Sequence, residues 1–133
     1  MSPGQHLPPE YDKGDETTVG GYAAVHARPA ALEGRDGKSY TLDILSDSTG
    51  EPARPYAAYL IFVQWSRLGA QKAEGHLETG FLAWGATAAA AEAALGALPL
   101  AEAQRALDAL ILARDGATTR RWWDAMREDD AGA

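Results

Sequence analysis

Cysteine and long apolar runs are both missing from this 133-residue sequence. The absence of cysteine excludes disulfide bonds, thiolate nucleophiles and zinc sites built on thiolates. No apolar run approaches the roughly 18 residues of a membrane span. The opening stretch, MSPGQHLPPEYDKGDE, contains no apolar signal-peptide core. From these absences we expect a soluble, cytoplasmic protein without a membrane partner.

Positive charge is also scarce. The chain has 12 Lys and Arg residues against 19 Asp and Glu residues, which gives a net charge of -7 and a pI of about 4.8. Proteins that bind DNA or RNA through the phosphate backbone need a cationic surface, so no nucleic-acid partner is expected. A hydrophobic fraction of 46% with 23% charged residues is typical of a globular domain.

The chain divides into a polar, proline-containing start and a patterned remainder. Residues 1–18 include Pro3, Pro8 and Pro9, which interrupt regular pairing, and we expect a flexible arm there. Residues 19–133 have the length of one domain.

Period-two alternation of apolar and polar residues predicts four strands. In KSYTLDILSD, Tyr40, Leu42 and Ile44 point to one face, as in a half-solvated antiparallel strand. The segment PYAAYLIFVQWSR is apolar on both faces, which indicates a central strand. The predicted strands are at about 20–29, 38–46, 56–66 and 76–84.

The pattern changes to helical spacing after Gly85. Thr87 can cap a first helix, Pro99 suits the first turn of a second, and Thr118 or Thr119 can cap a third. The predicted helices are at about 88–96, 99–115 and 119–128. Strands followed by helices predict an α+β domain, in which a four-stranded antiparallel sheet precedes three C-terminal helices packed on one face in two layers.

The stretch GRDGKS at 34–39 ends like a nucleotide-binding P-loop, but the match fails. Leu32 stands where that motif needs its first glycine, and Ser39 begins a strand rather than a helix. Asp36-Gly37 between two alternating segments instead predicts a hairpin turn with its charged residues in solvent.

Histidine and carboxylate residues offer limited chemistry. His76 and Glu78 open the zinc-deaminase pattern, but its cysteine pair is absent, so neither a metal nor a cofactor is expected. His26, His76, Glu78 and Trp84 could still line a small-molecule or catalytic cleft between sheet and helices. No serine lies in a nucleophile elbow. The sequence therefore favours a non-enzymatic protein, with this ligand-binding cleft as the alternative.

Two features predict association. The strand at 56–66 is apolar on both faces while helices cover only one, so Tyr56, Leu60 and Phe62, or the opposite set, are left for a homodimer contact. The N-terminal arm folding over that face is the alternative.

Adjacent tryptophans in RRWWDAM form the second feature. Trp122 shares a helix face with Ala125 and Met126, which leaves Trp123 as the candidate partner contact. The alternative is that both tryptophans close the edge of the core.

Residues 80–95, GFLAWGATAAAAEAAL, resemble the strand-to-helix joint of small HicB-type antitoxins. The long strands before this stretch and the lack of a basic DNA-binding segment after it depart from that family. No fold, partner or residue is therefore carried over. A regulatory partner of another protein is a third function, after a self-associating interaction module and the small-molecule site.

Overall fold

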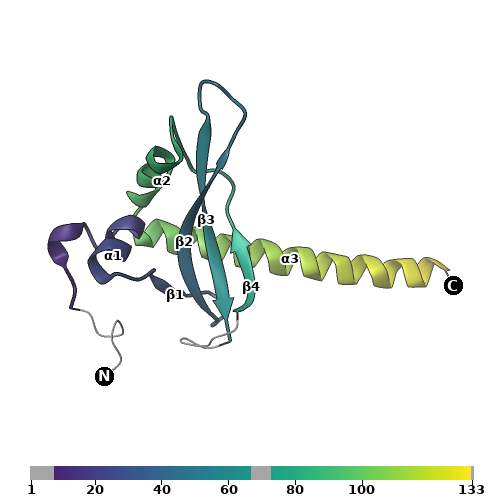
Figure 1. Ribbon diagram of the computed structural model, residues 1–133. Helices are drawn as coiled ribbons and strands as arrows, with labels where there is room; N and C mark the ends of the chain where they lie inside the picture. The colour runs from purple at the N-terminus through teal and green to yellow at the C-terminus, as the bar shows by residue number, and fades with distance from the viewer. Residues whose placement is uncertain (1–7, 67–72, 133) are drawn as a thin grey trace.

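The computed structural model describes residues 8–66 and 73–132, and within the last helix it describes the side chains up to residue 117 and at Met126. Figure 1 shows a twisted sheet with helices beside it and one long helix that extends past it. The elements in chain order are the 3-10 helix η1 (Tyr11–Lys13), α1 (Val19–His26), β1 (Ala31–Glu33), β2 (Ser39–Ser48), β3 (Tyr56–Trp65), β4 (Ala73–Glu78), β5 (Ala83–Gly85), α2 (Ala88–Gly96) and α3 (Leu100–Gly132).

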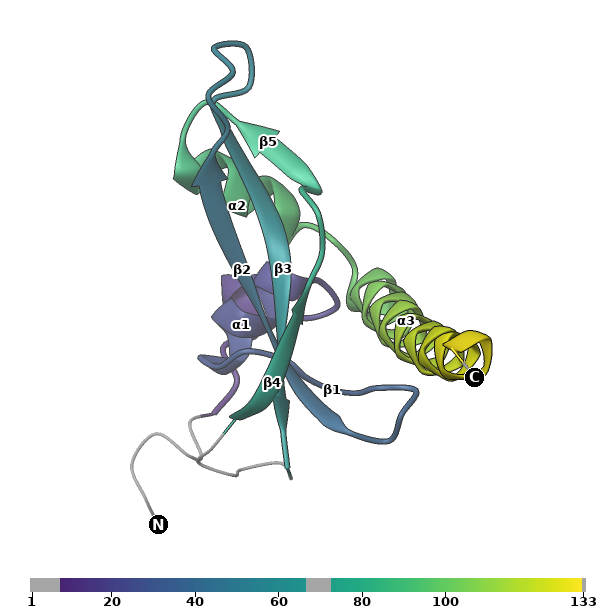
Figure 2. The same ribbon diagram turned by 90° about the vertical axis from the view of Figure 1, so that its right-hand side faces the viewer.

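The sheet is antiparallel throughout and runs in the order β1-β2-β3-β4. Strand β5 pairs with β3 on the same edge as β4 but further along it (Figure 2). Strand β3 is therefore central, as its apolar character on both faces predicts. The α+β prediction with an antiparallel sheet is confirmed.

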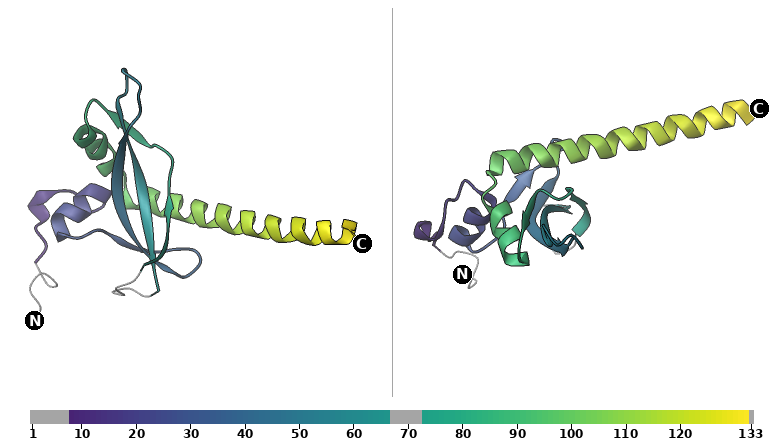
Figure 3. Two further views of the ribbon diagram at one scale, coloured as in Figure 1. Left: turned by 45° about the vertical axis from the view of Figure 1, so that its right-hand side comes forward. Right: turned by 90° about the horizontal axis from the view of Figure 1, so that it is seen from above.

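The core lies between one face of the sheet and the helices. Leu42 is paired with Phe62, and both are almost fully buried. Figure 3, seen from above, shows the helices on one side of the curled sheet. The buried core residues are Val19, Ala30, Tyr40, Leu42, Ala58, Leu60, Phe62, Ala91, Leu95, Ala103, Leu107 and Ile111.

The predicted strand at 20–29 is wrong, because this segment forms helix α1. The Thr18 side chain accepts a hydrogen bond from the Gly21 amide at 3.0 Å and caps the helix, which ends at His26 and is followed by Ala27 with φ of 53°. A Cβ on Gly20 would lie 3.0 Å from the Cα of Gly96, so the two glycines let α1 and α2 approach closely. Alanine and glycine fit the two-residue period of a strand and the 3.6-residue period of a helix equally well. The weak alternation therefore did not distinguish a strand from a helix.

The predicted strand at 76–84 is two strands separated by a bulge. Ile61 pairs with Glu78 and Ala58 pairs with Ala83, so residues 79–82 stand opposite residues 59–60. The Thr79 hydroxyl accepts a hydrogen bond from the Leu60 amide at 3.0 Å, which anchors the bulge. Extra residues on one strand bend it and redirect its side chains.

The two predicted helices at 99–115 and 119–128 are one continuous helix. Helix α3 spans 33 residues and passes through Gly116 without a break. At 1.5 Å per residue this is about 50 Å, and the C-terminal part extends beyond the sheet (Figure 1). One glycine in a helix costs only about 1 kcal/mol relative to alanine, so Gly116 alone does not end the helix. Two helices are therefore C-terminal, not three.

The predicted hairpin at GRDGKS is confirmed. Glu33 pairs with Ser39, and the Gly37 amide donates to the Gly34 carbonyl at 2.9 Å. Gly37 has φ of 79°, a left-handed conformation that favours glycine.

Replacing Gly37 with valine should destabilise the fold by about 1–2 kcal/mol, since a β-branched residue is strained at positive φ. Urea denaturation measures this change. Lys38→Ala in the same turn is the control and should shift the free energy of unfolding by less than about 0.5 kcal/mol. An unchanged midpoint for Gly37→Val would show that the turn relaxes.

The hairpin is docked on helix α3 rather than fully solvated. The Tyr40 hydroxyl donates to Asp36 Oδ2 at 2.7 Å, and Arg114 Nη2 donates to the same oxygen at 3.1 Å. The Arg35 amide donates to Asp108 Oδ1 at 2.8 Å. The expectation that the charges of GRDGKS lie in solvent is therefore wrong for Asp36, whose side chain is only 15% exposed.

Candidate functional site

The sheet face opposite the helices is the candidate functional surface, and we call it the open face. The residues that alternate with the core positions point outward here, as the strand register requires. The open face consists of Thr41, Asp43, Leu45 and Asp47 from β2, Tyr59, Ile61, Val63 and Trp65 from β3, His76 and Glu78 from β4, and Trp84 from β5.

Large apolar side chains are exposed at the β5 end of the open face. Leu45 is 39% exposed, Phe81 in the bulge 44% and Trp84 38%. The guanidinium of Arg54 lies 4.7 Å from the centre of the Trp84 ring. Several large apolar side chains exposed on one face of a folded domain are typical of an interaction surface.

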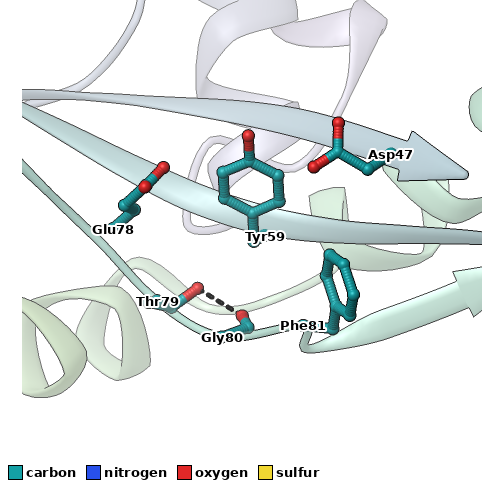
Figure 4. A pocket seen from close by; sticks show the side chains of 6 residues that line it. All are labelled: Asp47, Tyr59, Glu78, Thr79, Gly80 and Phe81. Carbon is teal, nitrogen blue, oxygen red and sulfur yellow. Dashed lines mark hydrogen bonds between the residues drawn. The ribbon is translucent and has the colours of Figure 1, made fainter. Parts of the chain in front are cut away.

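A shallow depression of about 290 Å³ lies at the bulge (Figure 4). Tyr59 and Phe81 both line it, and their ring centres are 6.1 Å apart with an angle of 55° between the ring planes. The lining residues are Asp47, Tyr59, Glu78, Thr79, Gly80 and Phe81.

The depression is electrically negative. Partial burial, together with the nearby carboxylates of Asp47 and Glu78, raises the pKa of the Tyr59 hydroxyl above its ordinary value of 10.0. Neither carboxylate forms a hydrogen bond or an ion pair within the described residues. The phenol therefore stays neutral beside two uncompensated negative charges.

The structure does not bring the predicted cleft residues together. His26 is on α1, where its Nε2 lies 3.0 Å from Glu16 Oε2 and its ring packs on Tyr22. His76 is exposed on β4, across the sheet from α1. Glu78 and Trp84 both lie on the open face. Only Glu78 lines the depression, so the four residues do not form one site.

The predicted interface residues lie mainly on the covered face. Leu60 and Phe62 have no exposed surface, and Tyr56 packs against the core. Leu60 and Phe62 therefore cannot contact a partner, and the opposite set around Ile61 is the one that the helices leave uncovered. Alternation defined the two sets but not which one the helices cover. The side chain of Trp123 lies outside the described residues.

Tyr59, Asp47, Thr79 and Phe81 were not among the predicted site residues. The one available signal was Gly80, since an isolated glycine within a strand pattern indicates a bulge. The bulge brings residues of separate strands to the same depression, and no local pattern encodes that meeting.

Comparison with known protein families, curated proteins and solved structures finds no match to this chain. Within residues 8–66 and 73–132, no helix combines the length and the apolar character needed to cross a membrane. In the same ranges, no group of three His, Asp or Glu residues could hold a metal ion.

Proposed function

We propose that this protein is a non-enzymatic interaction module that forms a homodimer through the open face of its sheet. The observation that carries the proposal is the exposure of Leu45, Phe81 and Trp84 on a face that the helices leave uncovered. Cyclic dimers are the commonest symmetric assemblies, and they pair the same patch of both copies.

The position of the N-terminal segment favours a second copy, rather than the N-terminal arm, as the cover of the open face. The Glu10 amide donates to the Val25 carbonyl at 2.8 Å, and the Tyr11 ring meets His26 edge-on at 6.3 Å. These contacts hold the described part of the arm against α1, on the helix side. The open face therefore has no cover within the described residues.

The projecting part of α3 offers a further contact for a second copy. Its sequence, ATTRRWWDAMRED, contains two tryptophans, and its three arginines are balanced by three acidic residues, so this contact does not rest on charge. Reaching past its own sheet, this helix can meet the open face of a second copy. Trp123 is the proposed aromatic anchor there.

The proposal places the homodimer in the cytoplasm, with no nucleic acid, membrane or cofactor as a partner. The acidic residues of the open face argue against a nucleic-acid partner, because they would repel phosphate groups.

Ile61→Glu should convert the dimer to a monomer, since a carboxylate in an apolar contact must lose its hydration. Sedimentation velocity of the wild-type chain in the micromolar range should give about twice the 14.1 kDa chain mass. Ala109→Glu, which adds the same charge at an exposed position of α3, is the control and should remain dimeric. A monomeric wild-type chain, or a dimeric Ile61→Glu, would contradict the proposal.

A further inference from the structure

Two aromatic rings and two carboxylates converge on the depression in the open face. Figure 4 shows the carboxyl groups of Asp47 and Glu78 on either side of the Tyr59 ring, with Phe81 beside it. These residues come from β2, β3, β4 and the bulge. The pairing of β3 with β2 and β4 places Tyr59 between Asp47 and Glu78. The three paired strands and the hydrogen bond between Thr79 and the Leu60 amide hold the arrangement within one copy of the chain.

The negative charge of the depression has no counterion within the described residues. Asp47 and Glu78 make neither a hydrogen bond nor an ion pair there. Arg54, from the neighbouring turn, lies over Trp84 and also contacts Glu51 at 3.4 Å. A ligand with positive charge would therefore gain attraction to both carboxylates without displacing a bound side chain.

The aromatic rings narrow the class of cation. Ring faces attract large, weakly hydrated cations such as alkylammonium groups, for which cation–π attraction adds to the carboxylate charge. A small metal ion would instead need several oxygen ligands around it, and the described residues contain no such group. The volume of about 290 Å³ is at the lower end for small-molecule sites.

We propose that this depression binds an organic ammonium group, either of a small molecule or of a modified lysine side chain. Tyr59 and Phe81 provide the aromatic contact, and Asp47 and Glu78 provide the charge. The site does not depend on self-association, because every lining residue belongs to one copy. If the same face also holds a second copy, the ammonium ligand and the dimer compete for it.

Choline and its neutral isostere 3,3-dimethylbutan-1-ol test the proposal, since they share shape and differ in charge. Titrations of the full chain, followed by NMR shifts of Tyr59 and Phe81, should show choline binding at least about tenfold more tightly than the alcohol. A peptide containing trimethyl-lysine is the second ligand. Tighter binding than choline would assign the ammonium group to a protein, and equal or weaker binding would assign it to a small molecule.

Three single variants locate the site. Glu78→Gln, Asp47→Asn and Phe81→Leu should each weaken choline binding about three- to tenfold. All three positions are exposed or line the surface, so the melting temperature should stay unchanged. Asp43→Asn removes a carboxylate from the same face outside the depression and should change affinity less than twofold.

Three outcomes would overturn the ammonium site. Equal affinity for choline and the alcohol would show that charge does not contribute. An equal loss in Asp43→Asn would indicate general attraction to an acidic face. No saturable shift at a protein concentration at which sedimentation shows a monomer would show that the depression has no ligand of this class. None of these outcomes changes the mass measured by sedimentation, so the homodimer and the ammonium site are tested independently.

Discussion

Phe62→Glu is expected to unfold the protein, whereas Ile61→Glu at the next position should leave it folded. Phe62 has no exposed surface and packs in the core, while Ile61 points to the open face. Removing a buried phenylalanine side chain typically costs about 3–5 kcal/mol, and burying a carboxylate adds to that loss. The sum is comparable with the total stability of a domain, about 5–15 kcal/mol.

Far-ultraviolet circular dichroism and urea denaturation measure the contrast between these two variants. Phe62→Leu is the control, because it keeps an apolar side chain and should cost about 1–3 kcal/mol without unfolding the chain. A folded Phe62→Glu with a native spectrum would show that the covered face has been assigned wrongly. The Phe62→Glu substitution also cannot test the dimer, because it would unfold the monomer.

Stability is expected to fall at both ends of the pH scale because of the contact between Asp36 and Tyr40. Burial acts to raise the pKa of Asp36, but hydrogen bonds from Tyr40, Lys38 and Arg114 outweigh it and hold the pKa below its ordinary value of 3.8. This contribution is therefore complete above pH 3.8. It is lost as the pH falls through the lower pKa of the folded state.

The contribution of Tyr40 to stability changes with pH in the opposite direction and is lost at alkaline pH. Burial and the hydrogen bond to Asp36 raise the pKa of the Tyr40 hydroxyl above its ordinary value of 10.0. Stability from the neutral phenol is complete below pH 10.0, and it is lost as the pH rises through the higher pKa of the folded state.

Asp36→Asn and Tyr40→Phe separate the two limbs of the stability curve. Each should lower the free energy of unfolding at neutral pH by about 1–3 kcal/mol, since a polar group around the buried Tyr40 loses its partner. Thermal denaturation across pH should show a flatter acid limb for Asp36→Asn and a flatter alkaline limb for Tyr40→Phe. If both limbs keep the wild-type slope, other groups control the pH dependence.

Much of the fold was predictable from local patterns. Alternation around Leu42 predicted β2, the doubly apolar run predicted a central β3, and Asp36-Gly37 predicted the first hairpin. The Thr87 hydroxyl accepts the Ala90 amide at 3.0 Å, which confirms the predicted cap of α2. These elements share one property: residues within a few positions of each other decide them.

The errors occurred where small residues leave the period undecided. Alanine and glycine in α1 fit a strand or a helix equally well, and the close approach of Gly20 to Gly96 decided in favour of the helix. Gly116 looked like a helix end, but no left-handed turn forms there and α3 continues. In the first case a contact between two helices decides the structure, and in the second case the uninterrupted helix decides it. Neither is visible in the local sequence.

The sequence by itself determined the α+β class, the two long strands, the hairpin turn and the absence of cysteine chemistry, because periodicity, turn residues and composition are local properties. Only the tertiary structure decided which face of β3 stays open. The meeting of Tyr59 with Phe81, Asp47 and Glu78 was decided there too. Residues from three strands and a bulge reach one depression only after the sheet has paired and the helices have covered its other face, and this pairing is a long-range event.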